Sequence, residues 1–395
     1  MQNIRRGFAF LVLLLIVSWL ACDSGDDDDN DDNSADNATD DDQTTDDDQS
    51  TDDDAGDDTG DDDTAATDWV WTPIAGTYCR DGSETGIAIR LAPESENLAV
   101  ILQGGGACFD PKSCADNPAK FDATDLEIWK KGEGSHGIYN LANPENPVGG
   151  WNIAFVPYCT GDLHSGSQPD GTAPGVAGKQ QYVGYQNMES IIAHLHEQFG
   201  DAKRVLLAGE SAGGFGVMLN YAHLARAFEN VPVTLLDDSG PLFESNDVLS
   251  PCLQLLVGLL WNTDPVVADG CPDCLQLNGD GFSGWHSWLA ETFPNGTFGL
   301  SSTMEDATIR EFFAFGMNHC TGGDIIPAAD YRAGLLALRD DLLAPTGRWS
   351  TYYVEGASHV ALTSDQRFYQ TTVGGKFLTE WLAELLMSVP TSVGP

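Results

Sequence analysis

The residues best suited to chemistry are Gly209-Glu210-Ser211-Ala212-Gly213, which fit the pattern G-x-S-x-G. An apolar run ends just before them, and a stretch with helical periodicity follows. Glycines at both flanks let the chain make a sharp turn from strand to helix, with the serine hydroxyl exposed at its tip. The helix N-terminus then favours negative charge that develops there. We therefore expect Ser211 to be a nucleophile; a glycine-rich turn without chemistry is the alternative.

A second glycine cluster, Gly104-Gly105-Gly106-Ala107, directly follows the apolar run 98–102. A loop after an early strand is where an enzyme with such an elbow places backbone donors for an oxyanion. We predict an oxyanion hole made by the N–H groups of Gly106, Ala107 and Ala212. A phosphate-binding loop is the weaker alternative, because no Gly-Lys-Ser/Thr follows and no helix begins there.

The base and the acid should follow the serine in the order acid, then histidine. His359 lies five residues beyond the last clear strand and ahead of a final helix, so a loop can bring its imidazole to the serine. His223 lies within the helix after Ser211 and should face away. His286 and His319 stand in segments whose pattern is hard to interpret.

The best candidate for the acid is Asp306, which closely follows a strand-like run and precedes a helix. A carboxylate there would orient His359 and stabilise its imidazolium form. Asp324 is the second candidate, and Asp237 or Asp238, at the end of the strand after the elbow, is the third.

These residues are positioned by short apolar runs that alternate with helical stretches, which predicts a mostly parallel sheet flanked by helices. The expected strands are 86–90, 98–102, 151–156, 204–208, 231–236, 296–301 and 351–354, and the expected helices are 187–199, 213–228 and 308–315. No linker or repeat interrupts residues 67–395, so they are expected to form one α/β domain. Residues 241–297 fit no sheet pattern and are candidates for a cap over the site.

The N-terminal segment is typical of export. Residues 1–22 combine Arg5 and Arg6 with an apolar run that is short for a membrane span. Trp19-Leu-Ala-Cys22 resembles a bacterial lipoprotein cleavage site, although ordinary signal-peptide cleavage is the alternative. We expect an exported protein, either secreted or held at a bacterial cell envelope by a lipid on Cys22.

Residues 23–66 are expected to be a disordered tether. They contain 22 aspartates and no Lys or Arg, so like charges repel one another and nothing forms a core. The spacing does not match an EF-hand loop, which makes a Ca²⁺ site the weaker interpretation.

Of the formal net charge of −43, a charge of −23 remains on residues 64–395. Nucleic-acid partners are therefore not expected, because phosphate binding needs clusters of Lys and Arg. We expect a monomer.

Eight cysteines remain besides Cys22, an even number that predicts disulfides in an exported chain without choosing their pairing. A zinc site at Cys271-x-x-Cys274 is the weaker alternative, and no metal or organic cofactor is expected.

Six blocks together resemble the pectin acetylesterase family, which includes the animal carboxylesterase Notum. In chain order they are Gln103-Gly-Gly-Gly-Ala-Cys108, Val156-Pro-Tyr-Cys-Thr-Gly-Asp162, Gly184-Tyr-Gln-Asn187, Gly209-Glu-Ser-Ala-Gly-Gly214, Asp238-Ser-Gly-Pro241 and Gly356-Ala-Ser-His359. The resemblance implies an α/β-hydrolase fold, a triad of Ser211, Asp306 and His359, and disulfides near the glycine-rich loop. The chain departs from the family at three positions. Ala107 stands where Trp is common, His164 where an aromatic residue is frequent, and Glu210 where Cys or Ser is frequent. These positions surround the pocket, so substrate identity transfers least.

The leading functional hypothesis is a serine carboxylesterase that removes small acyl groups such as acetyl from polysaccharides. Neutral acetylated glycans or small esters are as plausible as pectin, since an acidic domain repels polygalacturonate. A lipid or long-acyl esterase is the first alternative. A surface lipoprotein that binds without catalysis is the second.

Overall fold

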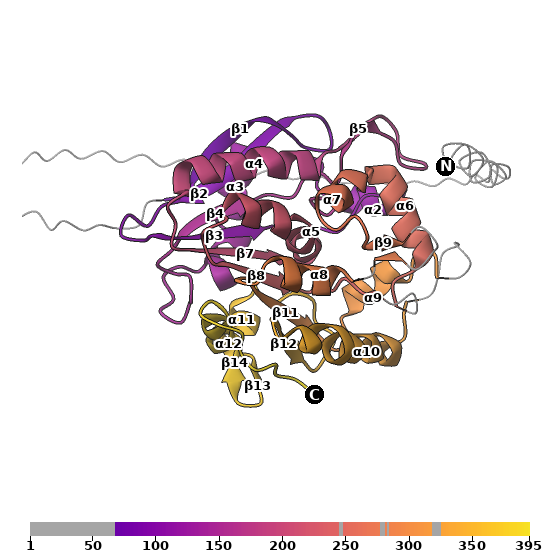
Figure 1. Cartoon of the computed structure of the whole chain (residues 1–395). Coiled ribbons are helices and arrows are strands. Elements are labelled where there is room, and N and C mark those ends of the chain that lie inside the picture. Colours follow the sequence, from indigo (N-terminus) through magenta and orange to yellow (C-terminus); the bar gives the residue numbers. More distant parts are fainter. Residues whose placement is uncertain (1–67, 245–247, 277–280, 283, 318–324) are drawn as a thin grey trace, which may run out of the picture. The chain divides into compact units, whose positions relative to one another are not determined.

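The predicted strands lie side by side in one sheet (Figure 1). The structure, a computed structural model, describes residues 68–244, 248–276, 281–282, 284–317 and 325–395. In spatial order the strands of the sheet are β1 (Val70–Tyr78), β2 (Glu84–Arg90), β4 (Asn152–Val156), β3 (Asn97–Leu102), β7 (Arg204–Glu210), β8 (Val233–Asp238), β11 (Thr297–Thr303) and β12 (Trp349–Val354).

From β4 to β12 all neighbouring strands are parallel, whereas β1 pairs with β2, and β2 with β4, in antiparallel fashion. This mostly parallel sheet confirms the predicted fold class. Each predicted strand has a counterpart, but β1 was not expected. It is an edge strand, mostly exposed, and it contains Pro73, so it lacks the apolar run that marked the others.

The strands of the sheet centre are buried on both faces because each contributes alternate side chains to two separate cores. In β3, Leu98, Val100 and Leu102 belong to one core, while Ala99 and Ile101 belong to the other. The first core also contains side chains of α4 and α5, and the second contains those of α12. Continuous apolar runs in the sequence therefore correspond to strands covered on both sides.

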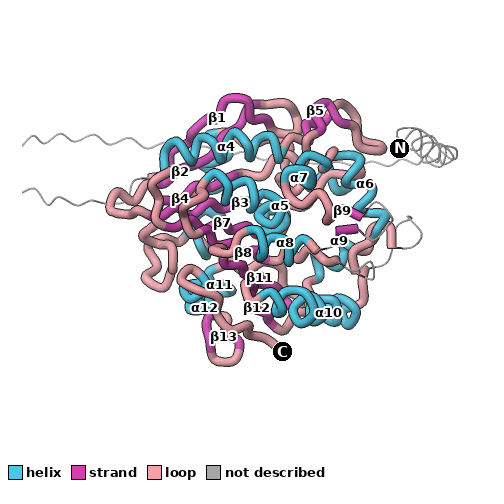
Figure 2. The backbone as a smooth tube through the Cα atoms, in the orientation of Figure 1, coloured by secondary structure: helices cyan, strands magenta, loops and turns pink. Residues whose placement is uncertain are grey.

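Helices surround the sheet (Figure 2). They are α2 (Pro111–Asp116), α3 (Ala123–Trp129), α4 (Gly184–Phe199), α5 (Ala212–Ala227), α6 (Pro251–Trp261), α7 (Asp264–Asp269), α8 (Trp285–Thr292), α9 (Ala307–Phe313), α10 (Ala328–Ala337), α11 (Asp365–Gln370) and α12 (Leu378–Leu385). Short helical turns are η1 (Glu133–Ser135), η2 (Gly137–Tyr139), η3 (Leu338–Leu343) and η4 (Ala344–Thr346). The three predicted helices are confirmed as α4, α5 and α9.

Small two-stranded sheets complete the elements. Their strands are β5 (Gln168–Gly171) with β6 (Gln180–Tyr182), β9 (Leu275–Gln276) with β10 (Gly281–Phe282), and β13 (Thr372–Val373) with β14 (Lys376–Phe377). The segment 241–297 thus supplies α6, α7, α8 and the β9–β10 pair. Helices α6, α7 and α9 lie together on the right of Figure 1.

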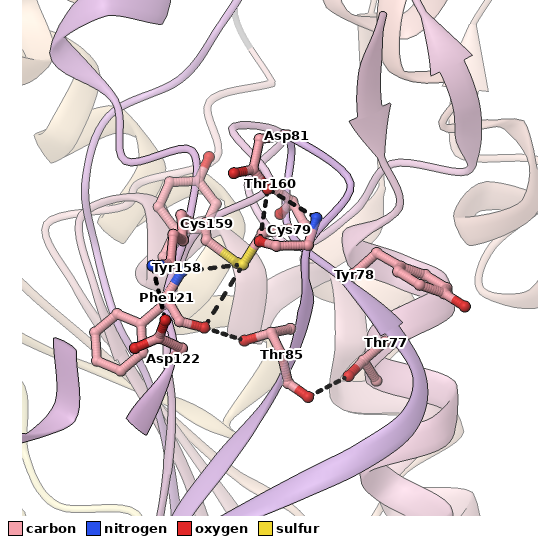
Figure 3. Close-up of a disulfide and its surroundings, with 12 residues drawn as sticks. Thr77, Tyr78, Cys79, Asp81, Thr85, Phe121, Asp122, Tyr158, Cys159 and Thr160 are labelled. Atoms are coloured by element: carbon pink, nitrogen blue, oxygen red, sulfur yellow. Dashed lines mark hydrogen bonds and ion pairs between the residues drawn. A yellow bond between two sulfur atoms is a disulfide. The ribbon is translucent and has the colours of Figure 1, made fainter. Parts of the chain in front are cut away.

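Three disulfides join described residues: Cys79–Cys159, Cys108–Cys114 and Cys271–Cys274. The Cys-x-x-Cys pair is thus bonded to itself, not arranged as a metal site. Figure 3 shows Cys79–Cys159, which links the turn after β1 to the loop after β4, beside Thr85 and Phe121. The Arg80 N–H reinforces the link by donating to the Cys159 carbonyl at 2.8 Å.

The predicted signal (1–22) and tether (23–66) lie outside the described residues. In the part of the chain that is described, no helix is both long and apolar enough to cross a membrane.

Candidate active site

Ser211 lies at the turn between β7 and α5, as the glycine pattern predicted. Its backbone has φ 55° and ψ −118°, a strained conformation for a residue with a side chain. A Cβ added at Gly209 would lie 2.2 Å from the Gly213 carbonyl oxygen, and one at Gly213 would lie 2.0 Å from that of Leu102. No side chain fits at either place, so Gly209 is required for the elbow to close on itself and Gly213 for it to pack against β3.

His359 connects Ser211 to Asp306. Its Nε2 lies 2.8 Å from Ser211 Oγ, and its Nδ1 lies 2.8 Å from Asp306 Oδ2. Asp306 and His359 follow β11 and β12, which are parallel neighbours, so two residues 53 positions apart emerge at the same edge of the sheet. The structure therefore brings together the three side chains chosen from the sequence.

Asp306 is fully buried and is fixed from two sides. Its Oδ1 accepts hydrogen bonds from the N–H groups of Thr308 and Ile309, so it caps the N-terminus of α9. Its Oδ2 faces His359. The cap holds the carboxylate in the orientation that a histidine partner needs.

Asp238, one of the third-choice acids, positions the histidine loop. Its Oδ2 accepts from the N–H groups of Ala361 and Leu362 at 2.6 and 2.8 Å, and its carbonyl oxygen accepts from the Ser211 N–H at 2.8 Å. The pKa of Asp238 lies above its ordinary value, because the effect of burial outweighs the lowering by the Leu362 and Ala361 amides. The Asp238-Ser-Gly-Pro241 block was the available sequence signal for this role.

Three backbone N–H groups near Ser211 are free to bind an oxyanion. Those of Gly106, Ala107 and Ala212 have no acceptor among the described residues. All three residues line the same cavity as Ser211. Gly106 has φ +78°, a conformation that L side chains rarely adopt, so the loop depends on glycine there. This arrangement suits a tetrahedral intermediate formed at Ser211 Oγ.

The cavity beside Ser211 has a volume of about 500 Å³, within the range of small-molecule pockets. Its walls are mostly aliphatic and aromatic, and α6 and α7 supply a large share of them. Representative lining residues are Phe109, Phe215, Val257, Trp261, Val266 and Phe313. The sequence indicated a cap in this region but not an apolar chamber.

The other candidates lie elsewhere. His223 packs its ring against Tyr185 at 5.8 Å, and the buried His286 bonds through Nδ1 to Glu244 at 3.0 Å. His319 and Asp324 lie outside the described residues. Among the residues that the structure describes, no three His, Cys, Asp or Glu side chains gather as metal ligands.

Comparison with known proteins points to one family. Residues 64–265 match the model of the Pectinacetylesterase family. Palmitoleoyl-protein carboxylesterase notum2 of Xenopus laevis is 32% identical over 189 residues, which cover 45% of this chain and 37% of that protein. Palmitoleoyl-protein carboxylesterase NOTUM of Homo sapiens is 29% identical over 175 residues, which cover 41% of this chain and 34% of that protein. The match therefore spans little more than a third of these curated relatives.

A solved structure of the Wnt deacylase Notum from Drosophila has a TM-score of 0.57 at 18% identity. The matched region covers 81% of this chain and 95% of the Drosophila Notum chain, which shows that the two proteins share a fold. The family match ends at residue 265, before Asp306 and His359, so the assignment of these two residues depends on geometry.

Proposed function

The chain belongs to the pectinacetylesterase family, and we propose that it is a serine carboxylesterase for esters of long apolar acyl groups. The reaction type is supported by the 2.8 Å contacts that join Ser211, His359 and Asp306, and by the nearby N–H groups that have no acceptor among the described residues. The apolar cavity of about 500 Å³ supports the substrate class, and it is the observation that carries the proposal.

In the proposed reaction, Ser211 Oγ attacks the acyl carbon as His359 Nε2 takes its proton. The oxyanion is stabilised by the N–H groups of Gly106, Ala107 and Ala212, and Asp306 stabilises the imidazolium. Collapse breaks the ester bond, and His359 gives its proton to the departing alcohol. Water, deprotonated by His359, then releases the acid and restores Ser211.

Cavity size favours a long acyl chain over the acetyl group that was the leading hypothesis from sequence. An acetyl group would leave most of the chamber without contacts. A longer chain would transfer its methylenes from water to apolar walls, at about 0.8 kcal/mol each. The Notum relatives, named palmitoleoyl-protein carboxylesterases, are consistent with this substrate class.

Acetyl esters of neutral glycans remain the second candidate, because the matching family model is named Pectinacetylesterase. The charge of −23 on residues 64–395 makes polygalacturonate itself a poorer partner. We also propose export, supported by the signal-like N-terminus and by the disulfides.

A chain-length series of nitrophenyl esters, from acetate to palmitate, tests the substrate class. We expect kcat/KM to rise with chain length by up to about fourfold per methylene until the cavity is filled. Ser211→Ala serves as the blank. A maximum at acetate, together with acetate release from acetylated glycans, would contradict the proposal and favour the second candidate.

A further inference from the structure

Glu210, the residue before the proposed nucleophile, connects the elbow to the oxyanion loop. It ends β7 and is 7% exposed. Its Oε1 accepts a hydrogen bond from the Gly104 N–H at 2.7 Å. Gly104 lies two residues before Gly106, so this carboxyl holds the start of the loop whose N–H groups face Ser211.

The contact between Glu210 and the loop leaves no spare room. A Cβ at Gly104 would lie 2.7 Å from the Glu210 carbonyl oxygen, 2.9 Å from its Oε2 and 3.0 Å from Ser211 Cβ. The loop thus rests directly on the carboxyl and on the serine. Moving the carboxyl would move the loop relative to Ser211.

A second carboxyl, that of Glu133 in η1, acts on the preceding residue of the same loop. It accepts a hydrogen bond from Trp129 Nε1 at 3.3 Å, and the Gln103 side chain is close enough to lower its pKa. Gln103 is itself fixed, since its Oε1 accepts from the Tyr158 N–H at 3.1 Å. Consecutive loop residues therefore lie beside two neighbouring carboxyls.

The surroundings of the pair favour the protonated form. Burial raises the pKa of Glu210, and the nearby Glu133 raises it further. Burial also raises the pKa of Glu133. Asp238 also raises the pKa of Glu210, and the two carboxyls raise the pKa of the buried Tyr139; neither of these neighbours is cationic. In the described part of the chain, no basic side chain forms an ion pair with either carboxyl.

We propose that Glu210, through the hydrogen bond that it accepts from the Gly104 N–H, positions the oxyanion loop against the elbow, which makes Glu210 a positioning residue. This inference rests on the proposed function. Deprotonation of the Glu210 carboxyl would place a negative charge beside the loop whose amides must bind an oxyanion. Turnover should then decline at alkaline pH while substrate binding in the apolar cavity is preserved.

Substitution of Glu210 by glutamine or alanine distinguishes the effect of its charge from that of its hydrogen-bond acceptor. The full-length protein is assayed from about pH 5 to pH 10 on a nitrophenyl ester, with the Ser211→Ala rate subtracted. Glu210→Gln keeps an acceptor oxygen without charge, so its neutral-pH kcat should stay within about threefold of the wild type and its alkaline decline should vanish. Glu210→Ala loses the acceptor, and kcat should fall about 10- to 100-fold with KM nearly unchanged.

Two further variants complete the test. Glu133→Gln removes the carboxyl that raises the pKa of Glu210, so the decline of kcat should begin at lower pH than in the wild type. An unmoved decline in this variant would count against the proposal even if Glu210→Ala does not fold. Glu189→Gln removes one charge from the exposed face of α4 and should follow the wild-type profile.

The outcomes that overturn the proposal differ from those that overturn the function. A folded Glu210→Ala with wild-type kcat, or a Glu210→Gln that keeps the alkaline decline, would refute the positioning role alone. A wild type without Ser211-dependent hydrolysis would remove both proposals.

Discussion

The proposed reacting groups and the cavity wall are built in different ways. Ser211, Asp306 and His359 each follow a strand of the sheet, and hydrogen bonds from neighbouring strands and loops fix them. Much of the wall comes from α6 and α7, which lie between β8 and β11 in the chain and add no strand to the sheet.

This difference in construction assigns catalysis to the strand ends and substrate choice to the cavity wall. Ladder hydrogen bonds hold the strand ends to within fractions of an ångström, as a triad requires. The wall needs only shape and apolarity, and α6 contains no charged residue. Substitutions at the strand ends should therefore change kcat for every ester, whereas substitutions in the wall should change which ester is preferred.

The largest effect is expected from Asp306→Asn. Asparagine can still cap α9, but its amide cannot hold the His359 tautomer that accepts a proton. If Asp306 is the acid of the proposed triad, kcat should fall about 10⁴-fold, as in Ser-His-Asp enzymes. Steady-state kinetics on short and long esters should show the same loss. Asp365→Asn, which alters an exposed contact with His136, is the matched control. Near-normal turnover in Asp306→Asn would remove it from the triad.

Gly106→Ala should have the next largest effect. Its Cβ would strain a backbone at φ +78° and contact Phe312 at 3.3 Å, displacing an oxyanion donor. We expect a loss of about 10²- to 10³-fold in kcat for all chain lengths. Gly178→Ala is a close control, because Gly178 has φ +81° and nothing within 4 Å of an added Cβ. Equal kinetics in the two variants would contradict the oxyanion assignment.

Gly258→Leu should act on selectivity alone. Gly258 lines the cavity from α6, and the one described atom within 4 Å of an added Cβ would be Thr263 Oγ1, at 3.8 Å. The leucine should fill space that a long acyl chain needs, lowering kcat/KM for palmitate about 10-fold or more while acetate is spared. Leucine also has a higher helix propensity than glycine, so the helix should not be lost. Gly258→Ala should change little. An equal loss of kcat/KM for palmitate and acetate in Gly258→Leu would contradict the idea that the cavity wall acts on substrate choice alone.

His164→Phe should change how stability depends on pH. His164 lies behind the elbow, where an added Cβ at Gly216 would meet its ring at 2.9 Å. Burial lowers the pKa of His164 to about 4 from an ordinary value of 6.5. Between these values only the unfolded chain binds the proton, so this contribution to stability is lost as pH falls from 6.5 toward 4.

Phenylalanine removes that proton-binding site. Relative to the wild type, the variant should therefore gain up to about 3 kcal/mol in free energy of unfolding as pH falls through this window. Urea unfolding at several pH values measures it. A difference between the two proteins that does not vary with pH would contradict the assignment.

Sequence was most informative where local rules and chain order act together. The elbow at Ser211 was predictable because glycines, a strand and a helix appear in one short segment. Asp306 and His359 followed from the rule that such side chains end successive strands. The edge strand β1 was missed because Pro73 and its exposed residues give no apolar run.

The rest depends on contacts between distant segments. The hydrogen bond from the Gly104 N–H to Glu210 joins residues 106 positions apart, and those from Ala361 and Leu362 to Asp238 span 123 and 124 positions. No local pattern encodes such pairings. The same is true of the apolar chamber, since an apolar helix such as α6 could equally have been buried in a core.

Labelling with two alkyl fluorophosphonates, one ethyl and one hexadecyl, reports on the proposed nucleophile and on the cavity in one experiment. Peptide mass mapping identifies the modified residue, and the rate of inactivation is measured for each probe. We predict a single adduct on Ser211, formed faster by the hexadecyl probe, and none in Ser211→Ala. An unlabelled Ser211 would contradict the hydrolase itself, and faster reaction of the ethyl probe would contradict the long-acyl cavity.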